Sequence, residues 1–382
     1  MNSFTLQNFD AQDFLANYWQ RRPLLIKQAI AGFEDPLSPD ELAGLALEPD
    51  VESRLITANN NGRLQVRHGP LEEVDFQDLN GEWTLLVQAC DQVCPEAREL
   101  LRYFQFLPDW RIDDVMASYA PIGGGVGPHF DKYDVFLLQG AGSRRWRLGQ
   151  RCDATTALSE NSELKILRDF KSSEEHVLEP GDILYVPPGL AHWGESVSAA
   201  TTWSIGFRSP AENEILSHFC DHLIERHNSD AQLRDPIVAP RLQAAQIQSE
   251  DLVAVQQVIQ RLVKNPEDLA LWYGELVTEK KYPTMEAAPD IDPDFDVIQL
   301  LKTNPNLVRA PDARLAFIET SDGLLLFYNG QSTKCSMELK PLVDYICKNI
   351  ELDPSTLLSL FSVNGATGLL KILLCEEVIF YD

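Results

Sequence analysis

The spacing of apolar and polar residues changes several times along the chain, and each change predicts a different element. Residues 12–30 carry an amphipathic helical pattern that stops before Pro23 and continues as a strand at Leu24–Lys27. A second helix is predicted after Ser38, whose side chain can cap it, with acidic residues in the first turn. Residues 52–90 alternate apolar and polar positions in short runs, which predicts strands that feed a sheet.

From residue 115 to residue 210 the pattern is that of β-structure. Short apolar runs such as DVFLLQG, DILYVPP and TTWSIGFR are separated by glycine and proline clusters, which favours a sandwich or a barrel. We therefore predict a first domain at 1–210. After Pro210 the apolar positions recur with the period of a helix, which predicts a helical segment at 211–281. Its expected helices are 211–228, 248–264 and 266–280.

A linker and a small mixed domain complete the predicted organisation. The stretch 282–296 holds three prolines and four aspartates, a composition typical of a linker, which we place at 282–294. Residues 295–382 mix helical and strand patterns, and two apolar runs beside Ser321-Asp322-Gly323 predict a hairpin. Helices combined with a hairpin indicate a winged-helix-like domain.

Charge narrows the classes of partner. The 382 residues carry 58 acidic and 32 basic side chains, a formal net charge of −26. Nucleic-acid binding draws its affinity mainly from basic side chains on phosphates, so direct nucleic-acid binding is not expected. An acidic protein favours a basic polypeptide partner through electrostatic attraction, although the same acidity also serves solubility.

The remaining composition bears on the compartment. No stretch approaches the roughly 20 apolar residues that span a bilayer, and the polar, acidic opening lacks the residue order of a signal peptide. The seven cysteines are scattered and odd in number, which favours free thiols over a disulfide framework. We expect a cytoplasmic protein that does not bind a membrane.

Two segments of the β-region carry candidate metal ligands. In the first, the glycine-rich stretch 123–127 leads into His129 and Asp131, and alternate residues of a strand project to one face, so both should point inward. The second, 181–192, ends in His192 and fits the cupin pattern Gly-x5-Pro-x-Gly-x2-His; the first fits its companion pattern with Asp in place of the second His. Two histidines and one carboxylate leave coordination positions open, which suits non-haem Fe(II) and O2 chemistry. These three residues are the predicted metal ligands and catalytic residues.

An oxygenase of this kind needs an electron source, commonly 2-oxoglutarate, whose far carboxylate requires a buried cation. Alternation puts Arg144 on one strand face with Trp146 and Leu148, which predicts that Arg144 lies inside the barrel with an anionic partner. The alternative is an edge-strand arginine that extends to water. The hydroxyls of Ser118 and Ser204, on predicted strands, are further candidates for the co-substrate site.

These residues belong to longer stretches that resemble a known family. The barrel looks like a JmjC-type 2-oxoglutarate oxygenase, a branch of the cupin superfamily. The whole chain resembles the bacterial ribosomal oxygenases, closely through residue 210 and more weakly beyond it. The stretches that carry the likeness are FLANYWQRRPLLIK (14–27), LPDWRIDDVM (107–116), GGGVGPHFDKYDVFLLQGAGSRRWRLG (123–149), LEPGDILYVPPGLAHWGES (178–196) and WSIGFRSP (203–210).

The resemblance implies a fold, a reaction and a partner. The fold would be α+β, with a double-stranded β-helix (JmjC/cupin) barrel, a helical dimerisation segment that forms a homodimer, and a winged-helix-like C-terminal domain. The reaction would be Fe(II)- and 2-oxoglutarate-dependent hydroxylation, with O2, of an arginine side chain in the basic large-subunit ribosomal protein L-sixteen. By motif position His129, Asp131 and His192 match the family's iron ligands, and Arg144 and Ser118 match its 2-oxoglutarate contacts.

Other interpretations of the same sequence stay open. Asp113, Asp114 and Asp134 lie near the metal segment and could receive the substrate guanidinium, or could be solvated acids at strand ends. A metal-binding cupin isomerase or a non-redox binding module is the alternative function, although simple cupins typically carry three His and one Glu. A winged-helix regulator is a third, but its DNA binding would need a basic helical face that the C-terminal region lacks.

Two further motifs are weaker. His218 and His222, with Cys220 and His227 nearby, have a spacing that can hold zinc, but no clear fourth ligand or Cys-x2-Cys partner accompanies them, which favours packing. The glycine-rich stretch 123–127 lacks the Lys-Ser/Thr of a phosphate-binding loop and leads into a predicted strand rather than a helix.

Overall fold

Two units of the chain each bury a core of their own. In the computed structural model they comprise Met1–Ser209 and Pro210–Asp382. Within the described residues, no helix is both long enough and apolar enough to cross a membrane. The structure describes residues 4–58, 64–159, 163–208, 210–226, 231–234, 243, 245–282, 295–303 and 307–381.

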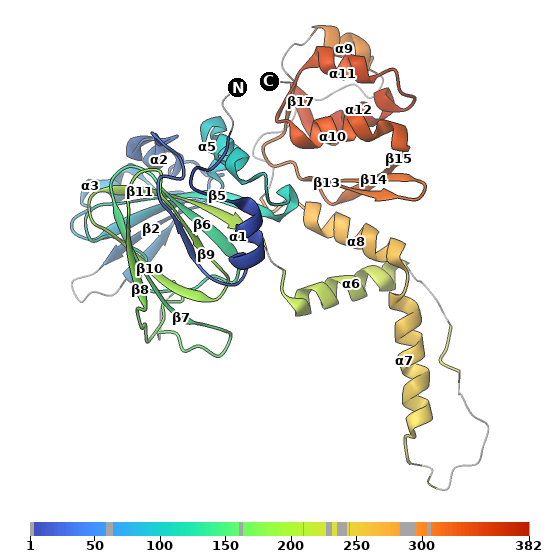
Figure 1. The fold of residues 1–382 in the computed structure, drawn as a ribbon, viewed down its shortest axis with the longest axis horizontal. Coiled ribbons are helices and arrows are strands. Elements are labelled where there is room, and N and C mark those ends of the chain that lie inside the picture. The colour runs from blue at the N-terminus through green and yellow to red at the C-terminus, as the bar shows by residue number, and fades with distance from the viewer. Residues whose placement is uncertain are drawn as a thin grey trace. The chain divides into compact units, whose positions relative to one another are not determined.

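The first unit is a barrel of two β-sheets. Its strands are β1 (Leu24–Ile26), β2 (Ser53–Ala58), β3 (Leu64–His68), β4 (Trp83–Val87), β5 (Ile112–Ala120), β6 (Asp134–Gln139), β7 (Arg144–Arg151), β8 (Glu174–Leu178), β9 (Ile183–Val186), β10 (Leu190–Ser196) and β11 (Ala200–Phe207). The larger sheet has the order β1-β9-β6-β11-β5-β4-β2-β3 and the smaller the order β10-β7-β8. Figure 1 shows how the strands of this unit curve into a barrel. Leu137 and Leu184 of the larger sheet pack with Trp146 and Leu148 of the smaller one, so the core lies between the sheets.

Short helices cover the outer side of the larger sheet. Helix α1 (Ala11–Asn17) places Phe14 in an aromatic cluster with Phe136 and Tyr185, and helix α2 (Pro39–Leu45) starts with a capping box between Ser38 and Glu41. Both helices were expected from the sequence and are confirmed. The others are α3 (Glu73–Gln77), α4 (Cys90–Val93), α5 (Pro95–Glu99) and the 3-10 helices Leu100–Phe104 and Asp109–Arg111.

The second unit joins a helical stretch to a winged-helix domain. Helices α6 (Glu212–Arg226), α7 (Ser249–Val263) and α8 (Pro266–Thr278) follow the expected bounds closely. Helix α8 also packs on the domain that follows, because Gly274 leaves room for the ring of Phe327, whose atoms lie 2.3 Å from where a Cβ would stand. The predicted linker, 282–294, lies outside the described residues except for Tyr282.

The winged-helix domain combines two small sheets with helices around one apolar core. Its hairpin of β13 and β14 surrounds Ser321-Asp322 as predicted. Its elements are α9 (Val297–Thr303), β12 (Leu307–Arg309), β13 (Leu315–Thr320), β14 (Gly323–Tyr328), β15 (Gln331–Cys335), the 3-10 helix Met337–Leu339, α10 (Lys340–Lys348), β16 (Glu351–Leu352), α11 (Pro354–Leu360), α12 (Ala366–Cys375) and β17 (Ile379–Tyr381).

Candidate metal centre and co-substrate pocket

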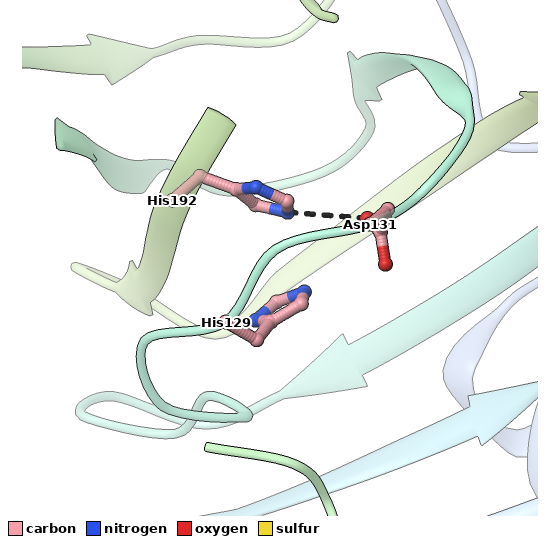
Figure 2. Close-up of side chains that lie close together, drawn as sticks. All are labelled: His129, Asp131 and His192. Atoms are coloured by element: carbon pink, nitrogen blue, oxygen red, sulfur yellow. Dashed lines mark ion pairs between the residues drawn. The ribbon is translucent and has the colours of Figure 1, made fainter. Parts of the chain in front are cut away.

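Three side chains from two separated segments converge inside the barrel. His129, Asp131 and His192 each offer a ligand atom, and these atoms lie within 4.8 Å of one another (Figure 2). The Nε2 atom of His192 is 3.5 Å from Oδ2 of Asp131. Among the described residues this is the group of His, Cys, Asp and Glu side chains that could hold a metal ion, and the candidate zinc residues His218 and His222 form no such group. The fourth of those candidates, His227, lies outside the described residues.

The backbone of the His-x-Asp segment is irregular, so the expectation of a regular strand there is wrong. His129 forms only an isolated bridge, in which its N–H donates to the carbonyl of His192 (3.0 Å) and the N–H of His192 donates back (2.8 Å). The N–H of Gly189 donates to the carbonyl of Asp131 at 2.7 Å. Main-chain hydrogen bonds to β10 and to the turn before it therefore hold the two inward side chains without a ladder.

The glycine-rich stretch allows this close approach. A Cβ on Gly125 would lie 2.2 Å from the carbonyl oxygen of Gly194 in β10, so no larger residue fits there without displacing the backbone. Gly127 has φ of +82°, which glycine adopts without steric cost. The glycine-rich stretch thus lets its segment pack directly against β10. It does not form a phosphate-binding loop.

Hydrogen bonds fix the tautomers of both histidines. Nδ1 of His129 lies 3.0 Å from the carbonyl oxygen of Gly127, and Nδ1 of His192 lies 3.0 Å from that of Leu190. A carbonyl oxygen can only accept, so Nδ1 carries the proton in each ring. Nε2 of each ring is then left with a lone pair for a cation.

Burial keeps the His192 ring neutral. Burial, together with the nearby His129 ring, lowers the pKa of His192 to about 4 against the opposing effect of Asp131. Because the ring carries no charge at neutral pH, the 3.5 Å contact between His192 and Asp131 is not an ion pair there. A neutral imidazole beside a carboxylate is the donor set that binds a divalent metal without first losing a proton.

Arg144 lies inside the barrel, as the alternation predicted. Its side chain is 3% exposed, and its neighbours Trp146 and Leu148 point the same way. Nη1 donates to the hydroxyl of Ser118 at 3.0 Å and Nη2 to that of Ser196 at 3.2 Å, while Nε has no hydrogen-bond partner. No carboxylate of a described residue forms an ion pair with Arg144, and burial lowers its pKa to about 10.

Ser196 was missed by the sequence analysis, and the role of Ser204 in the co-substrate site stays a prediction. Ser196 stands directly opposite Arg144 in the pairing of β10 with β7, so the strand register was the signal for it. Ser204 lies in β11 opposite Met116 and is 8% exposed, but no hydrogen bond joins it to the Arg144 guanidinium.

The three candidate substrate-binding aspartates separate into two groups. A Cβ on Gly206 of β11 would lie 3.5 Å from the Cβ of Asp113, 3.7 Å from Oδ1 of Asp114 and 3.7 Å from the ring of Tyr133. Burial, then the charges of Asp131, Asp114 and Asp113, raise the pKa of Tyr133, so its hydroxyl lies in the field of these carboxylates and stays protonated.

Asp134 is held apart from them. Its carboxylate is fully buried and accepts hydrogen bonds from the hydroxyl of Tyr185 (2.6 Å) and the side chain of Gln20 (3.0 Å). Its neighbour Val135 points into the barrel core, so Asp134 points to the opposite face of β6. These contacts favour a structural role for Asp134 over receipt of the substrate guanidinium.

Comparisons with known proteins identify the family. Residues 99–215 match the family model described as JmjC domain, and residues 257–374 match that of the ROXA-like winged helix. The ribosomal protein uL16 3-hydroxylase of Escherichia coli is 38% identical over 342 residues, which cover 89% of each chain. This chain belongs to the ribosomal oxygenases.

Other ribosomal oxygenases extend the likeness over the whole length. A probable ribosomal oxygenase of Haemophilus influenzae is 32% identical over 83% of this chain and 80% of its own. The X-ray structure of Escherichia coli YcfD superposes with a TM-score of 0.87 at 35% identity and covers 98% of this chain and 99% of that one. A structure of YcfD in complex with cobalt and 2-oxoglutarate gives a TM-score of 0.84 at 35% identity, with 99% of each chain covered.

Proposed function

We propose that this chain is an Fe(II)- and 2-oxoglutarate-dependent dioxygenase that hydroxylates an arginine side chain of a large-subunit ribosomal protein. The observation that carries the proposal is a His-Asp-His cluster in the same barrel as a buried arginine that has no anionic partner among the described residues. The cluster fits a metal and the arginine fits an organic acid. A non-redox cupin would require only the first.

His129, Asp131 and His192 would hold the metal. Two neutral imidazoles that present Nε2 and one carboxylate oxygen occupy one side of an octahedral ion and leave the other side open, as in non-haem Fe(II) oxygenases. YcfD has been solved with cobalt bound, and a divalent ion of the same class suits this donor set. When bound, iron supplies activation of O2, with 2-oxoglutarate as the electron source.

Arg144 would bind the far carboxylate of 2-oxoglutarate. A guanidinium that is 3% exposed has lost its hydration, and the two serine hydroxyls are neutral, so its charge is uncompensated within the described residues. A carboxylate restores that compensation with charge-assisted hydrogen bonds. Ser118 and Ser196, on opposite sheets, fix the plane of the guanidinium before the acid arrives.

Asp114 is the carboxylate we assign to the substrate guanidinium, with Asp113 and Tyr133 beside it. Oδ1 of Asp114 faces the space left by Gly206, whereas Asp134 is fully engaged elsewhere. One strand, β5, thus carries Ser118 of the co-substrate pocket and Asp114 of the substrate pocket on either side of Met116. This order would hold the substrate arginine and 2-oxoglutarate along one wall of the barrel.

A relative's substrate and the net charge of this chain support a ribosomal protein as the partner. The Escherichia coli relative is named for hydroxylation of uL16, and a chain of net charge −26 attracts basic proteins. Such a substrate would place the enzyme in the cytoplasm.

The assembly we propose is a homodimer formed through the helical stretch. Helix α7 exposes an apolar stripe at helical spacing, in which Leu252 is 61% and Ile259 is 56% exposed. A second copy of the same helix would cover this stripe, because symmetric pairing buries like faces against each other.

Mass spectrometry of purified ribosomal proteins tests the activity directly. Incubation with the full chain, Fe(II), 2-oxoglutarate and O2 should add one oxygen to an arginine of one large-subunit protein and release succinate in step. The Asp131→Ala protein is the matched control and should give neither product. Succinate that forms without any oxidised protein would mean a different substrate, and no iron-dependent succinate would favour the non-redox cupin.

A further inference from the structure

Strands β5 and β11 lose register at Gly206. Ile205 pairs with Val115, but the next recorded pair is Phe207 with Ile112, so Asp113 and Asp114 together stand opposite Gly206 alone. An extra residue of this kind is a β-bulge, which breaks strict alternation and re-aims side chains. Both aspartates consequently approach the same point, the position where a Cβ on Gly206 would stand.

On the side of β5 that faces away from β11, the bulge contacts the turn after β4 and no paired strand of the described residues. The recorded pairing of β4 with β5 stops at Val87 and Ala117. Beyond it, the N–H of Val115 donates to Oδ1 of Asp91 at 2.8 Å, and the N–H of Ala89 donates to Oδ2 of Asp114 at 3.1 Å. The two bonds run in opposite directions between the same two segments and form a reciprocal clamp.

This clamp uses costly groups. Asp91 is 7% exposed, and an ionised carboxylate at that depth loses hydration that only partners can replace. The like charge of Asp114 in β5 opposes ionisation of Asp91, whereas the guanidinium of Arg98 in α5 favours it. The thiols of Cys90 and Cys94 lie in the same segment, in α4 and at its end. Ala89 has φ of +50°, a left-handed conformation that is sterically unfavourable for a residue with a Cβ. Costs of this kind persist where the surroundings fix a conformation that function requires.

We propose that Asp91 is a positioning residue for substrate recognition, because it pins the bulge that aims Asp114 at the substrate side chain. The inference rests on the substrate role of Asp114 given under the proposed function. Oδ2 of Asp114 accepts a hydrogen bond from Ala89, and Oδ1 lies 3.7 Å from where a Cβ on Gly206 would stand. Asp91 itself touches neither the metal ligands nor that space.

The test compares three full-length variants, with the ribosomal protein that the wild type oxidises as substrate. Asp91→Ala removes the acceptor for Val115, Asp91→Asn keeps an oxygen acceptor without the charge, and Cys90→Ala removes a buried neighbour on the same helix that leaves the clamp intact. Asp91→Ala should raise the KM for the protein substrate at least about tenfold, the effect of one lost charge-assisted hydrogen bond. The KM for 2-oxoglutarate and kcat should stay within about twofold. Asp91→Asn should recover most of the loss, and Cys90→Ala should match the wild type.

A purely structural role predicts another pattern. Equal losses in kcat and in both KM values for Asp91→Ala, or an unchanged substrate KM, would overturn the inference. If the wild type oxidises no ribosomal protein, the proposed function fails, and a crystal structure of Asp91→Asn and Asp91→Ala then decides the clamp on its own. An Asp114 carboxylate that keeps its place in the Ala variant refutes positioning by Asp91, and one that turns away from Gly206 supports it.

Discussion

Nη1 of Arg144 donates a 3.0 Å hydrogen bond to the hydroxyl of Ser118, which links the smaller sheet to the larger one across the barrel interior. The bond leaves a buried positive charge without a negative one to match it among the described residues. Water cannot supply the missing charge, so the pair is half of a binding site, and the other half has to come from a ligand.

Removal of the Arg144 guanidinium should weaken 2-oxoglutarate binding far more than it alters the metal site. Truncation of one partner of a buried charge pair costs about 2–5 kcal/mol, so Arg144→Ala should raise the KM for 2-oxoglutarate by well over tenfold. Arg145→Ala is the matched control, because Arg145 is the next residue on the same strand and pairs outward with Glu175. Succinate release measured against 2-oxoglutarate concentration checks both, and an unchanged KM for Arg144→Ala would remove Arg144 from the co-substrate site.

Loss of either the first histidine or the carboxylate should abolish metal binding and turnover together. His129→Ala and Asp131→Ala each leave two donors, too few to retain a divalent ion against solvent. Isothermal titration with Co(II) measures binding apart from activity. His176→Ala, a histidine on β8 outside the cluster, should bind like the wild type. Full cobalt affinity in Asp131→Ala would refute the ligand set.

Much of the site follows from sequence because its determinants are local. The His-x-Asp pair, the proline-glycine turn before His192 and the alternation around Arg144 each lie within a few residues. Ser196 needed the register of β10 against β7, which no local pattern gives. The irregular backbone at His129 was hidden for a similar reason, since the hydrogen bonds that hold this segment come from Gly189 and His192, about 60 residues further along the chain.

The fold shows the same division. Strands in the barrel and helices after Pro210 were predicted because their apolar periods are strong, but α12 was not assigned. Its sequence is almost wholly apolar, and Leu369, Leu370, Leu373 and Leu374 are all buried, so no polar face gives a helical period. The packing of α8 onto β13–β15 likewise depends on Gly274 meeting Phe327, which only the tertiary structure reveals.

A charge on the exposed stripe of α7 should dissociate the proposed dimer. Leu252→Glu combined with Ile259→Glu would bury two carboxylates without partners in a symmetric contact, which costs several kcal/mol. Light scattering should then report the monomer mass. Gln257→Glu adds charge to the same helix at an exposed polar position and should leave the mass unchanged. If the double variant keeps the wild-type mass, the contact lies elsewhere.

Asp134 should prove to be a stability residue and not a substrate residue. Asp134→Ala leaves the hydroxyl of Tyr185 and the side chain of Gln20 without their buried acceptor, and breaking such a network costs about 3–5 kcal/mol. Urea unfolding should record that loss, while the substrate KM of the folded fraction stays near the wild type. Asp114→Ala should show the reverse, a raised substrate KM with a smaller change in stability.

Asp91 links substrate positioning to the pH dependence of stability. Burial raises the pKa of Asp91 from its ordinary value near 3.8 to about 6 in the folded protein, with Asp114 acting in the same direction and the Val115 N–H and Arg98 opposing. A raised folded-state pKa means that this group stabilises the fold below about pH 4 and that the contribution is lost as pH rises to about 6. Asp91→Asn carries no charge to desolvate, so its stability relative to the wild type should rise over that interval and level off above it. At pH 7 the free energy of unfolding of Asp91→Asn relative to the wild type should be on the order of 3 kcal/mol higher than it is below pH 4.

Urea unfolding of both proteins at pH 4, 5, 6 and 7 measures this difference. Asp153→Asn provides a control whose difference from the wild type should stay nearly constant over these pH values. Hydrogen bonds from Thr155 lower the pKa of that exposed carboxyl, so its stabilising effect is lost only as pH falls below about 4. A stability difference between wild type and Asp91→Asn that does not vary with pH would mean that folding leaves the pKa of Asp91 at its ordinary value. A difference that is still growing at pH 7 would mean that Asp91 remains protonated in the folded protein at that pH. The clamp on Val115 would then rest on a neutral acceptor, and Asp91→Asn should be indistinguishable from the wild type in substrate KM as well.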